Sequence, residues 1–406
     1  MSESSHPQLR RALGLPLLTL YGLGVTVGAG IYVLVGATAA EAGTYAPVAF
    51  IVAAIAVAFT GLTYCELSTR FPVSAGEAAY VEAGFHWPTL SLIVGLMVAL
   101  SGVVSAAAVT IGAASYLQAF LALPLPVLTI SIVLAMGLIA YWGIAQSVSL
   151  AALITLVELG GLVFVILWGF GTSTPDVADF AGLIPPLEAG PWLGIGAASL
   201  LAFFAFVGFE DMANVAEEVK DPTRTMPRAV LLTLGLSTLL YVLATVAVMF
   251  SVPIDELSGS EAPLILVFSN APQWVRDLFA AIAVVATVNG ILVQIIMASR
   301  VIYGLASRRQ LPHFLASVSP RTQTPGPATV LIVLAIIVLS QSLPIAALAE
   351  HTSQIVLSVF VLVNIALIRI KRTETDGTMA TGFRVPAVIP MLGVLTSLLL
   401  LASSFL

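Results

Sequence analysis

Charged side chains are scarce in this sequence. Of its 406 residues, only 9% are Asp, Glu, Lys or Arg, whereas about a quarter of an ordinary soluble domain is charged. Hydrophobic residues make up 59% of the chain. This composition excludes a soluble globular enzyme, and it also excludes disorder, which needs few apolar residues. With 15 Lys and Arg and a net charge of −6, the chain lacks the basic face of a nucleic-acid-binding protein. We expect a membrane-embedded protein surrounded by lipid, with no nucleic-acid partner.

Cysteine and histidine are also too few to build a reactive or metal site. The single cysteine, Cys65, has no partner for an intrachain disulfide. The four histidines, His6, His86, His313 and His351, have no ligand spacing to one another or to Cys65, so we expect no metal. Neither a His-Glu-x-x-His pattern nor a convergent set of Ser and His is found. We therefore expect no catalytic residues, no cofactor and no enzymatic activity.

Long apolar runs are what the sequence has instead. A helix needs about 20 apolar residues to span a bilayer. Eleven segments meet this requirement: 15–40, 45–68, 88–122, 126–143, 147–171, 191–216, 228–252, 276–306, 327–343, 346–369 and 386–405. Turn and breaker residues, mainly prolines, lie between them. The sequence therefore predicts an all-α polytopic membrane protein with about 11 transmembrane helices.

The basic residues predict how these spans are oriented. If the tail 1–14 lies inside the cell, 14 of the 15 Lys and Arg residues fall on inner segments, and only Arg276 falls on an outer loop. Lys and Arg near the ends of spans are retained on the cytoplasmic side. We therefore expect a multi-pass protein of the cell inner membrane with a cytoplasmic N-terminus.

The first span contains a cluster of glycines at mid-membrane depth. Gly22, Gly24, Gly28 and Gly30 lie within nine residues. Glycine is about 1 kcal/mol less favourable than alanine inside a helix, so the cluster predicts a break in the helix. Close helix packing is the alternative, because Gly24 and Gly28 have the small-xxx-small spacing. A dinucleotide-binding loop is excluded, since it requires a preceding strand.

The sixth span carries Glu210 and Asp211 just after Gly208. An ionised acid at membrane depth costs about 2.5 kcal/mol or more, so both should face a cavity or the protein interior. Interrupted spans at matching positions of two halves indicate a substrate site in a secondary transporter. Residues 15–171 and 191–370 would then be inverted repeats, with 386–405 as an additional helix.

A broken helix offers free backbone groups to a ligand. The N–H groups at a half-helix N-terminus suit a carboxylate, and the carbonyls at a C-terminus suit an ammonium group. An α-amino acid carries both groups. The two predicted breaks therefore favour a zwitterionic substrate.

Four segments of the chain have a pattern typical of one transporter family. They are Val27 to Tyr32; Tyr64 to Leu67 with Phe71 to Tyr80; Phe203 to Gly208 with Glu210 and Glu217 to Arg228; and Ala298 to Gly304 with Leu311-Pro312. In these segments the chain resembles the amino acid/polyamine/organocation transporter superfamily. The resemblance implies a LeuT-type fold of five plus five inverted helices, discontinuous helices 1 and 6, and transport by alternating access.

The resemblance also implies which residues bind substrate. The broken part of the first span would hold the carboxylate and amino groups of the substrate, through Thr26, Val27, Gly28, Ala29 and Gly30. The sixth span would supply aromatic and carbonyl contacts through Phe203, Phe204, Ala205, Phe206 and Gly208. For any single aromatic residue, plain packing against lipid or core is the alternative.

Glu158 in the fifth span is a third intramembrane acid. Several proton-linked members of the superfamily have a lysine at the matching place, where its ammonium replaces a sodium ion beside the first span. This sequence reverses that charge, so the lysine mechanism cannot be carried over. Glu158 could bind a proton, help coordinate Na⁺, or form a simple buried hydrogen bond. Our hypothesis is proton-coupled uptake, with Glu158 as the titrating group and Glu210 as a second one.

The third span restricts the choice of substrate. Residues 101–108 carry no charge, and no Lys or Arg lies near the midplane of the spans, so acidic substrates are disfavoured. A small neutral amino acid is favoured. The alternatives are a cationic amino acid or polyamine, transported or exchanged and balanced by Asp211 or Glu210, a sodium-coupled carrier, and an amino acid sensor that does not transport.

The inner loops supply one further expectation. Ser74 to Glu77 has the spacing of a capping box and predicts a short helix through Ala83. This segment could join an inner gate of ion pairs with Glu66, Arg70, Glu217, Glu218, Lys220 and Arg228. A solvated loop held by its charges is the other interpretation.

Overall fold

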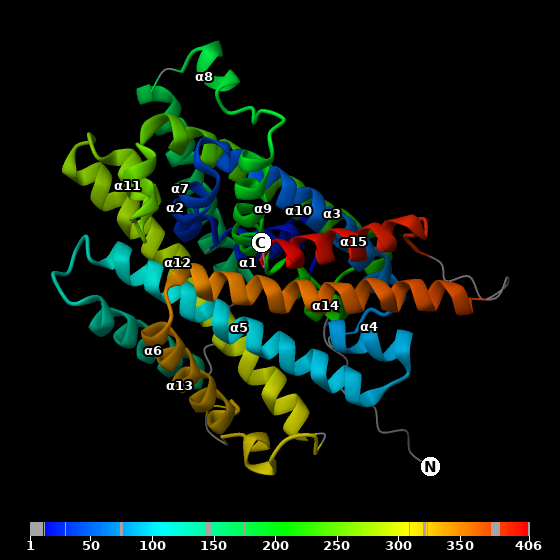
Figure 1. Cartoon of the computed structure of the whole chain (residues 1–406). Coiled ribbons are helices and arrows are strands. Elements are labelled where there is room, and N and C mark those ends of the chain that lie inside the picture. The colour runs from blue at the N-terminus through cyan, green and yellow to red at the C-terminus, as the bar shows by residue number, and fades with distance from the viewer. Residues whose placement is uncertain are drawn as a thin grey trace, which may run out of the picture.

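The computed structural model consists of helices joined by short connections (Figure 1). It describes residues 11, 13–28, 30–73, 76–142, 148–173, 175–307, 309–319, 322, 324–374 and 382–404. Within these ranges the only strand-like pairing is an isolated parallel bridge between Leu13 and Val219. The predicted all-α class is therefore confirmed.

Every predicted span coincides with an apolar helix or a pair of helices. The spans are α1 (Leu15–Val27) with α2 (Gly30–Ala42), α3 (Ala46–Arg70), α5 (Pro88–Leu117), α6 (Leu125–Trp142), α7 (Val148–Ser173), α9 (Ala189–Phe204) with η2 (Phe209–Glu218), α10 (Pro222–Ser251), α12 (Gln273–Ser307), α13 (Gly326–Ser342), α14 (Ile345–Thr373) and α15 (Val388–Ser403). In the described part of the chain, 8 helical stretches are long and apolar enough to cross a membrane. Three shorter apolar helices, α1, α13 and α15, complete the predicted segments.

Short elements connect these spans. They are η1 (Gly43–Tyr45), α4 (Gly76–Phe85), α8 (Val177–Ala181), α11 (Ile254–Ser258), η3 (Pro263–Phe268) and η4 (His313–Ala316). The predicted helix after Phe71 corresponds to α4, whereas Ser74 of its predicted cap lies outside the described residues. Proline stands in the first turn of α1, α3, α5, α10 and α13, where its missing N–H leaves no hydrogen bond unmade.

The broken first span lies at the centre of the bundle. α1 packs against α7 and α10, while α2 packs against α9. The long helices α5 and α12 pack along each other, and α14 packs against α5 and α15 (Figure 1). The two broken spans are therefore surrounded by protein on several sides. The division into repeats at 15–171 and 191–370 stays a prediction.

A cluster of charges joins α3 to α14 at the end of the bundle that carries α4. Glu66 is fully buried and accepts hydrogen bonds from Arg70 Nε at 2.9 Å and Lys371 Nζ at 2.7 Å. Arg70 also pairs with Glu374 at 2.7 Å. The Val385 backbone N–H donates to the second Glu66 oxygen at 2.8 Å. Glu66 and Arg70, expected in an inner gate, thus pair with α14 and the segment that follows it.

Glu66→Gln is expected to destabilise the protein by about 3 kcal/mol, because it removes the buried carboxylate that pairs with two partly buried cations and leaves Lys371 without that counter-charge. The measurement is the apparent unfolding temperature of the purified protein in detergent. Arg224→Gln is the matched control, since the Arg224–Asp221 pair is 3.9 Å apart with side chains that are 78% and 56% exposed. Such exposed pairs contribute little. Equal shifts for the two variants would contradict the role assigned to Glu66.

Candidate functional site

The breaks in the first and sixth spans lie against each other. The first lies between Val27, where α1 ends, and Gly30, where α2 begins; the second lies between Phe204 and Phe209. A Cβ atom added to Gly30 would collide with the backbone of Ala205. Only glycine therefore allows the start of α2 to approach the second break this closely.

Gly208 gives the second break its shape. Its φ of 117° lies in the left-handed region, which a residue with a Cβ rarely adopts. An added Cβ would also lie 2.8 Å from the Val25 carbonyl oxygen. In the first span both sequence interpretations apply: Gly24 is a packing contact, since its Cβ would collide with Thr155 of α7, whereas Gly28 lies at the break.

Tyr241 of α10 bridges the two breaks. Its buried hydroxyl lies 2.7 Å from the carbonyl oxygen of Thr26 and 2.7 Å from that of Ala205. A tyrosine hydroxyl has one proton, so it donates to only one of these carbonyls at a time. The two breaks therefore share a single donor, and a movement of either break changes the hydrogen bonding of the other.

Tyr241→Phe is expected to lower the unfolding free energy by about 1–3 kcal/mol, because it leaves a buried carbonyl unsatisfied. Transport should slow as well, since the breaks lose their common donor. Thermal unfolding and uptake into proteoliposomes measure the two effects. Tyr80→Phe is the control, because the buried Tyr80 hydroxyl has no hydrogen-bond partner. If Tyr241→Phe changes stability and uptake no more than Tyr80→Phe does, the hydrogen bonds of Tyr241 do not couple the two breaks.

A small cavity, here called the break pocket, opens beside the junction. It has a volume of about 20 Å³, enough for about one water-sized group. Three of the predicted substrate-binding residues line it: Thr26, Gly30 and Phe204. The other lining residues are Gly24, Val25, Ser105, Val109, Val207, Gly290, Val293 and Gln294.

The remaining predicted substrate-binding residues lie around this pocket rather than on its wall. Phe203 packs edge-on against Phe360 with ring centroids 5.7 Å apart, and Phe206 packs in the same way against Tyr241 at 5.1 Å. Both rings are buried, which matches the packing alternative. Val27, Gly28, Ala205 and Gly208 belong to the backbone of the junction, and Ala29 lies outside the described residues.

Glu158 faces the break in the first span. Its side chain on α7 is 0% exposed, and Oε1 accepts a hydrogen bond from Asn289 Nδ2 of α12 at 3.1 Å. Oε2 has no hydrogen-bond partner and lies 3.5 Å from the Cβ position of Gly28. The hydroxyl of Tyr32 in α2 donates to the backbone carbonyl of Glu158 at 2.6 Å. One carboxyl group thus joins α7, α12 and the break, with one oxygen left to bind a proton or a cation.

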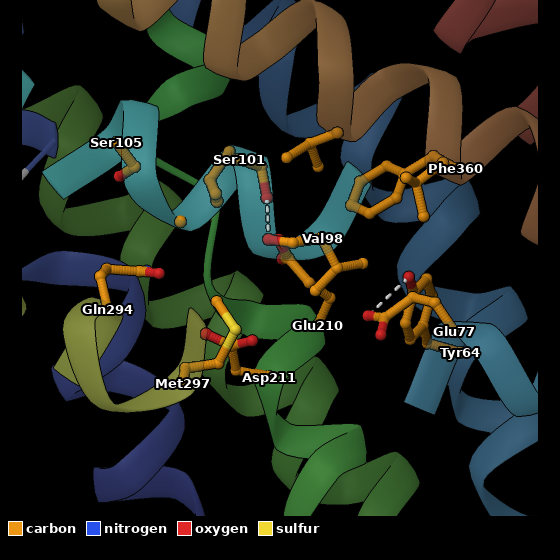
Figure 2. A pocket seen from close by; sticks show the side chains of 14 residues that line it. Tyr64, Glu77, Val98, Ser101, Ser105, Glu210, Asp211, Gln294, Met297 and Phe360 are labelled. Carbon is orange, nitrogen blue, oxygen red and sulfur yellow. Dashed lines mark hydrogen bonds between the residues drawn. The ribbon is translucent and has the colours of Figure 1, made fainter. Parts of the chain in front are cut away.

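A second cavity, here called the acid pocket, lies beside η2, the helix that follows the sixth-span break (Figure 2). Three acids line it: Glu77 of α4, and Glu210 and Asp211 of η2. Glu210 Oε2 accepts the backbone N–H of Gly208 at 2.9 Å, and Glu77 accepts the Tyr64 hydroxyl at 3.1 Å. Burial raises the pKa of Glu77 to about 7. Glu210 therefore lies in a site separate from Glu158.

Sequence reasoning missed three polar residues that connect these sites. Tyr241 bridges the breaks, Asn289 binds Glu158, and Gln294 lines both pockets. The two amides lie in the apolar run of α12, and an amide inside a span is expensive unless it has a partner or a function. That cost could have identified Asn289 and Gln294 as candidate site residues from the sequence. Tyr241 gave no such signal, because tyrosine is common in apolar helices.

The chemistry of the break pocket suits a ligand with hydrogen-bond donors. The Thr26 hydroxyl and the Gln294 Oε1 atom are buried and have no hydrogen-bond partner. Among the residues that the structure describes, no three His, Cys, Asp or Glu side chains are placed to hold a metal ion. An organic ligand with an ammonium group fits these acceptors.

Comparison with known proteins decides the family. The model of a protein family described as amino acid permease matches residues 13–406. The chain belongs to the amino acid permease family. This family assignment makes the permease a membrane transporter of amino acids, in agreement with the resemblance in the sequence.

The relatives of the permease carry transporter names. It is 29% identical to the branched-chain amino acid permease BcaP of Bacillus subtilis, over 98% of this chain and 89% of that protein. It is 33% identical to an uncharacterised transporter of Mycobacterium tuberculosis, over 78% and 71%. The identity to the vacuolar cationic amino acid transporter 4 of Arabidopsis thaliana is 30%, over 91% and 65%.

Among solved structures, the permease is similar to a Na⁺-coupled sialic acid symporter in a substrate-bound outward-open state. The TM-score is 0.64 at 12% sequence identity, over 98% of this chain and 90% of that one. At this identity the similarity concerns the fold alone. It agrees with the expected transporter fold with discontinuous helices 1 and 6.

Proposed function

We propose that the permease imports amino acids across the cell inner membrane by secondary active transport coupled to protons. The observation that carries this proposal is Glu158, whose buried Oε2 has no hydrogen-bond partner and lies beside the break at Gly28. A buried carboxyl group without a counter-ion favours its neutral, protonated form. Binding of a proton there would stabilise one position of the first span relative to α7.

The substrate is proposed to bind at the break pocket. Thr26 and Gly30 would contact its amino and carboxylate groups, and Phe204 would cover it. Five residues would act through their backbone groups: Val27, Gly28 and Ala29 at the first break, and Ala205 and Gly208 at the second. Phe203 and Phe206 would hold the break in place by packing. Tyr241 supports this division of roles because it contacts both breaks.

Glu210 is proposed as a second titrating group. Its side chain accepts the N–H of Gly208 within its own break, so a change in its protonation would alter the hydrogen bonding of the sixth span. Two sites that each favour a proton could move the two breaks together. The cytoplasmic N-terminus is proposed on the distribution of the basic residues.

Sodium coupling is the second candidate. The unpartnered Glu158 oxygen and the Ala286 carbonyl oxygen lie 3.5 and 3.6 Å from the Cβ position of Gly28, so both face the first break, and oxygen ligands suit hard cations. The symporter of similar fold is named as Na⁺-coupled. The choice of substrate is likewise between two classes: a small neutral amino acid, favoured by the uncharged third span, and a cationic amino acid or polyamine.

Uptake of labelled amino acids into proteoliposomes tests the proposal. Transport should be saturable, driven by an inward pH gradient, and unchanged when K⁺ replaces Na⁺. Uptake that requires Na⁺ would identify sodium, and not the proton, as the coupling ion. Saturable binding without flux would instead identify a sensor, and exchange without any ion gradient would identify an exchanger.

A further inference from the structure

The acid pocket adjoins the break pocket. Ser105, Val207 and Gln294 line both, and each pocket has a volume of about 20 Å³. The two pockets therefore share a wall, so the two ends of one extended ligand could occupy both. The second pocket is large enough for one further water-sized group.

Three side chains with carboxyl groups line the acid pocket, and among its described lining residues no basic side chain balances them. Glu77, Glu210 and Asp211 are all buried, and none of the described residues that line the pocket is Lys, Arg or His. Arg300, further along α12, is exposed and does not line it. A cation that enters such a cavity favours the ionised form of the carboxyl groups around it, and low-dielectric walls strengthen that attraction.

An independent feature shows what the pocket lacks. The side chain of Gln294 is more than nine-tenths buried, with 8% exposure, and its Oε1 atom has no hydrogen-bond partner. In Figure 2 its amide points into the pocket, toward the region between Ser101 and Met297. A buried acceptor without a donor lacks the hydrogen bond that such groups normally make. The pocket therefore leaves the Gln294 oxygen without a donor, and its described lining carries no positive charge.

An ammonium group supplies both a hydrogen-bond donor and a positive charge. It carries three N–H donors, no acceptor and one positive charge, and it is about the size of a water molecule. A metal ion fits less well, because no three acids in the described part of the chain are placed to hold one. The apolar wall formed by Val98, Val207 and Met297 suits the methylene chain that would carry the ammonium.

We propose that the acid pocket binds the side-chain ammonium of a cationic amino acid, such as lysine or ornithine, whose α-amino and carboxylate groups bind at the break. This inference rests on the proposed function and selects its substrate class. Asp211, Glu77 and Gln294 would hold the ammonium, and the uncharged third span would contact the aliphatic part of the substrate.

Lysine and norleucine test this directly in the unaltered protein. The two have the same four-carbon side chain, and only lysine ends in an ammonium group. We expect lysine to raise the unfolding temperature and to exchange in proteoliposomes with an affinity on the order of tenfold higher than norleucine. Norleucine binding as tightly as lysine would overturn the inference alone. Exchange of a small neutral amino acid such as alanine without exchange of lysine would also overturn the inference and leave the proposed function standing. Absence of exchange for all three would contradict the proposed function, and this inference with it.

Substitutions in the acid pocket test whether this pocket recognises the lysine side chain. Asp211→Asn and Glu77→Gln, whose side chains line the acid pocket and not the break pocket, should each weaken lysine binding on the order of tenfold and leave norleucine binding unchanged. Glu82→Gln is the matched control, because Glu82 is an exposed acid on the same helix, α4, as Glu77. Equal losses for lysine and norleucine in both pocket variants would mean that these residues only support the fold, and would overturn the proposal.

Discussion

Replacing Glu158 with glutamine is expected to abolish accumulation of amino acid driven by a pH gradient. Glutamine is permanently neutral, so it resembles the protonated carboxyl group and cannot release a proton. An inward gradient of two pH units corresponds to about 2.7 kcal/mol, or roughly 100-fold accumulation for one proton per substrate. In the variant the internal and external concentrations should become equal. Labelled uptake into proteoliposomes with an acidic exterior measures this ratio.

Exchange separates a coupling defect from a folding defect. Glu158→Gln keeps a side-chain oxygen that can accept from Asn289, so counterflow of amino acid at equal pH should persist. Glu188→Gln provides the chemical control, because Glu188 is exposed at the start of α9. Full gradient-driven accumulation by Glu158→Gln would show that this carboxyl group is only a buried hydrogen-bonding residue.

Gly208→Ala is expected to have the largest effect on the junction itself. The left-handed φ of Gly208 disfavours alanine by about 1–2 kcal/mol. The added methyl group would also press on the Val25 carbonyl at 2.8 Å, and overpacking of this kind costs about 1–3 kcal/mol. The break would have to move away from the first span. We expect about 3 kcal/mol of destabilisation and a loss of transport, measured by thermal unfolding and by uptake.

A second glycine provides the control for this substitution. Gly235 lies within α10, and nothing lies within 4 Å of its Cβ position. Gly235→Ala should therefore be neutral or should stabilise the helix by up to about 1 kcal/mol. A Gly208→Ala variant as stable and as active as Gly235→Ala would show that the second break does not depend on the left-handed residue.

The positions of the breaks could be predicted from the sequence because glycine and buried acids are expensive inside a span. In the structure, the cluster from Gly22 to Gly30 contains a break of only two residues, which follows Val27. Gly24 lies within the helix before this break and packs against Thr155 instead. Sequence alone could not divide these roles. Both are played by small residues, and only the neighbouring helix distinguishes them.

The cross-span contacts could not be predicted. Tyr241 binds Thr26 across 215 residues, and Asn289 binds Glu158 across 131. Such contacts depend on how helices rotate about their axes, and apolar spans in lipid leave little amphipathic pattern to reveal that rotation. The same limit explains why the sequence predicts an inner gate that contains Glu66 and Arg70 but does not indicate that they pair with Lys371 and Glu374.

Proton movement during amino acid uptake tests the central claim most directly. The permease would be reconstituted with a pH-sensitive dye inside the vesicles, in medium free of Na⁺, and amino acid would be added outside. The account predicts that the interior acidifies as the wild-type protein takes up substrate, and that Glu158→Gln exchanges substrate without any acidification. Uptake by the wild-type protein with no change in internal pH would contradict the account.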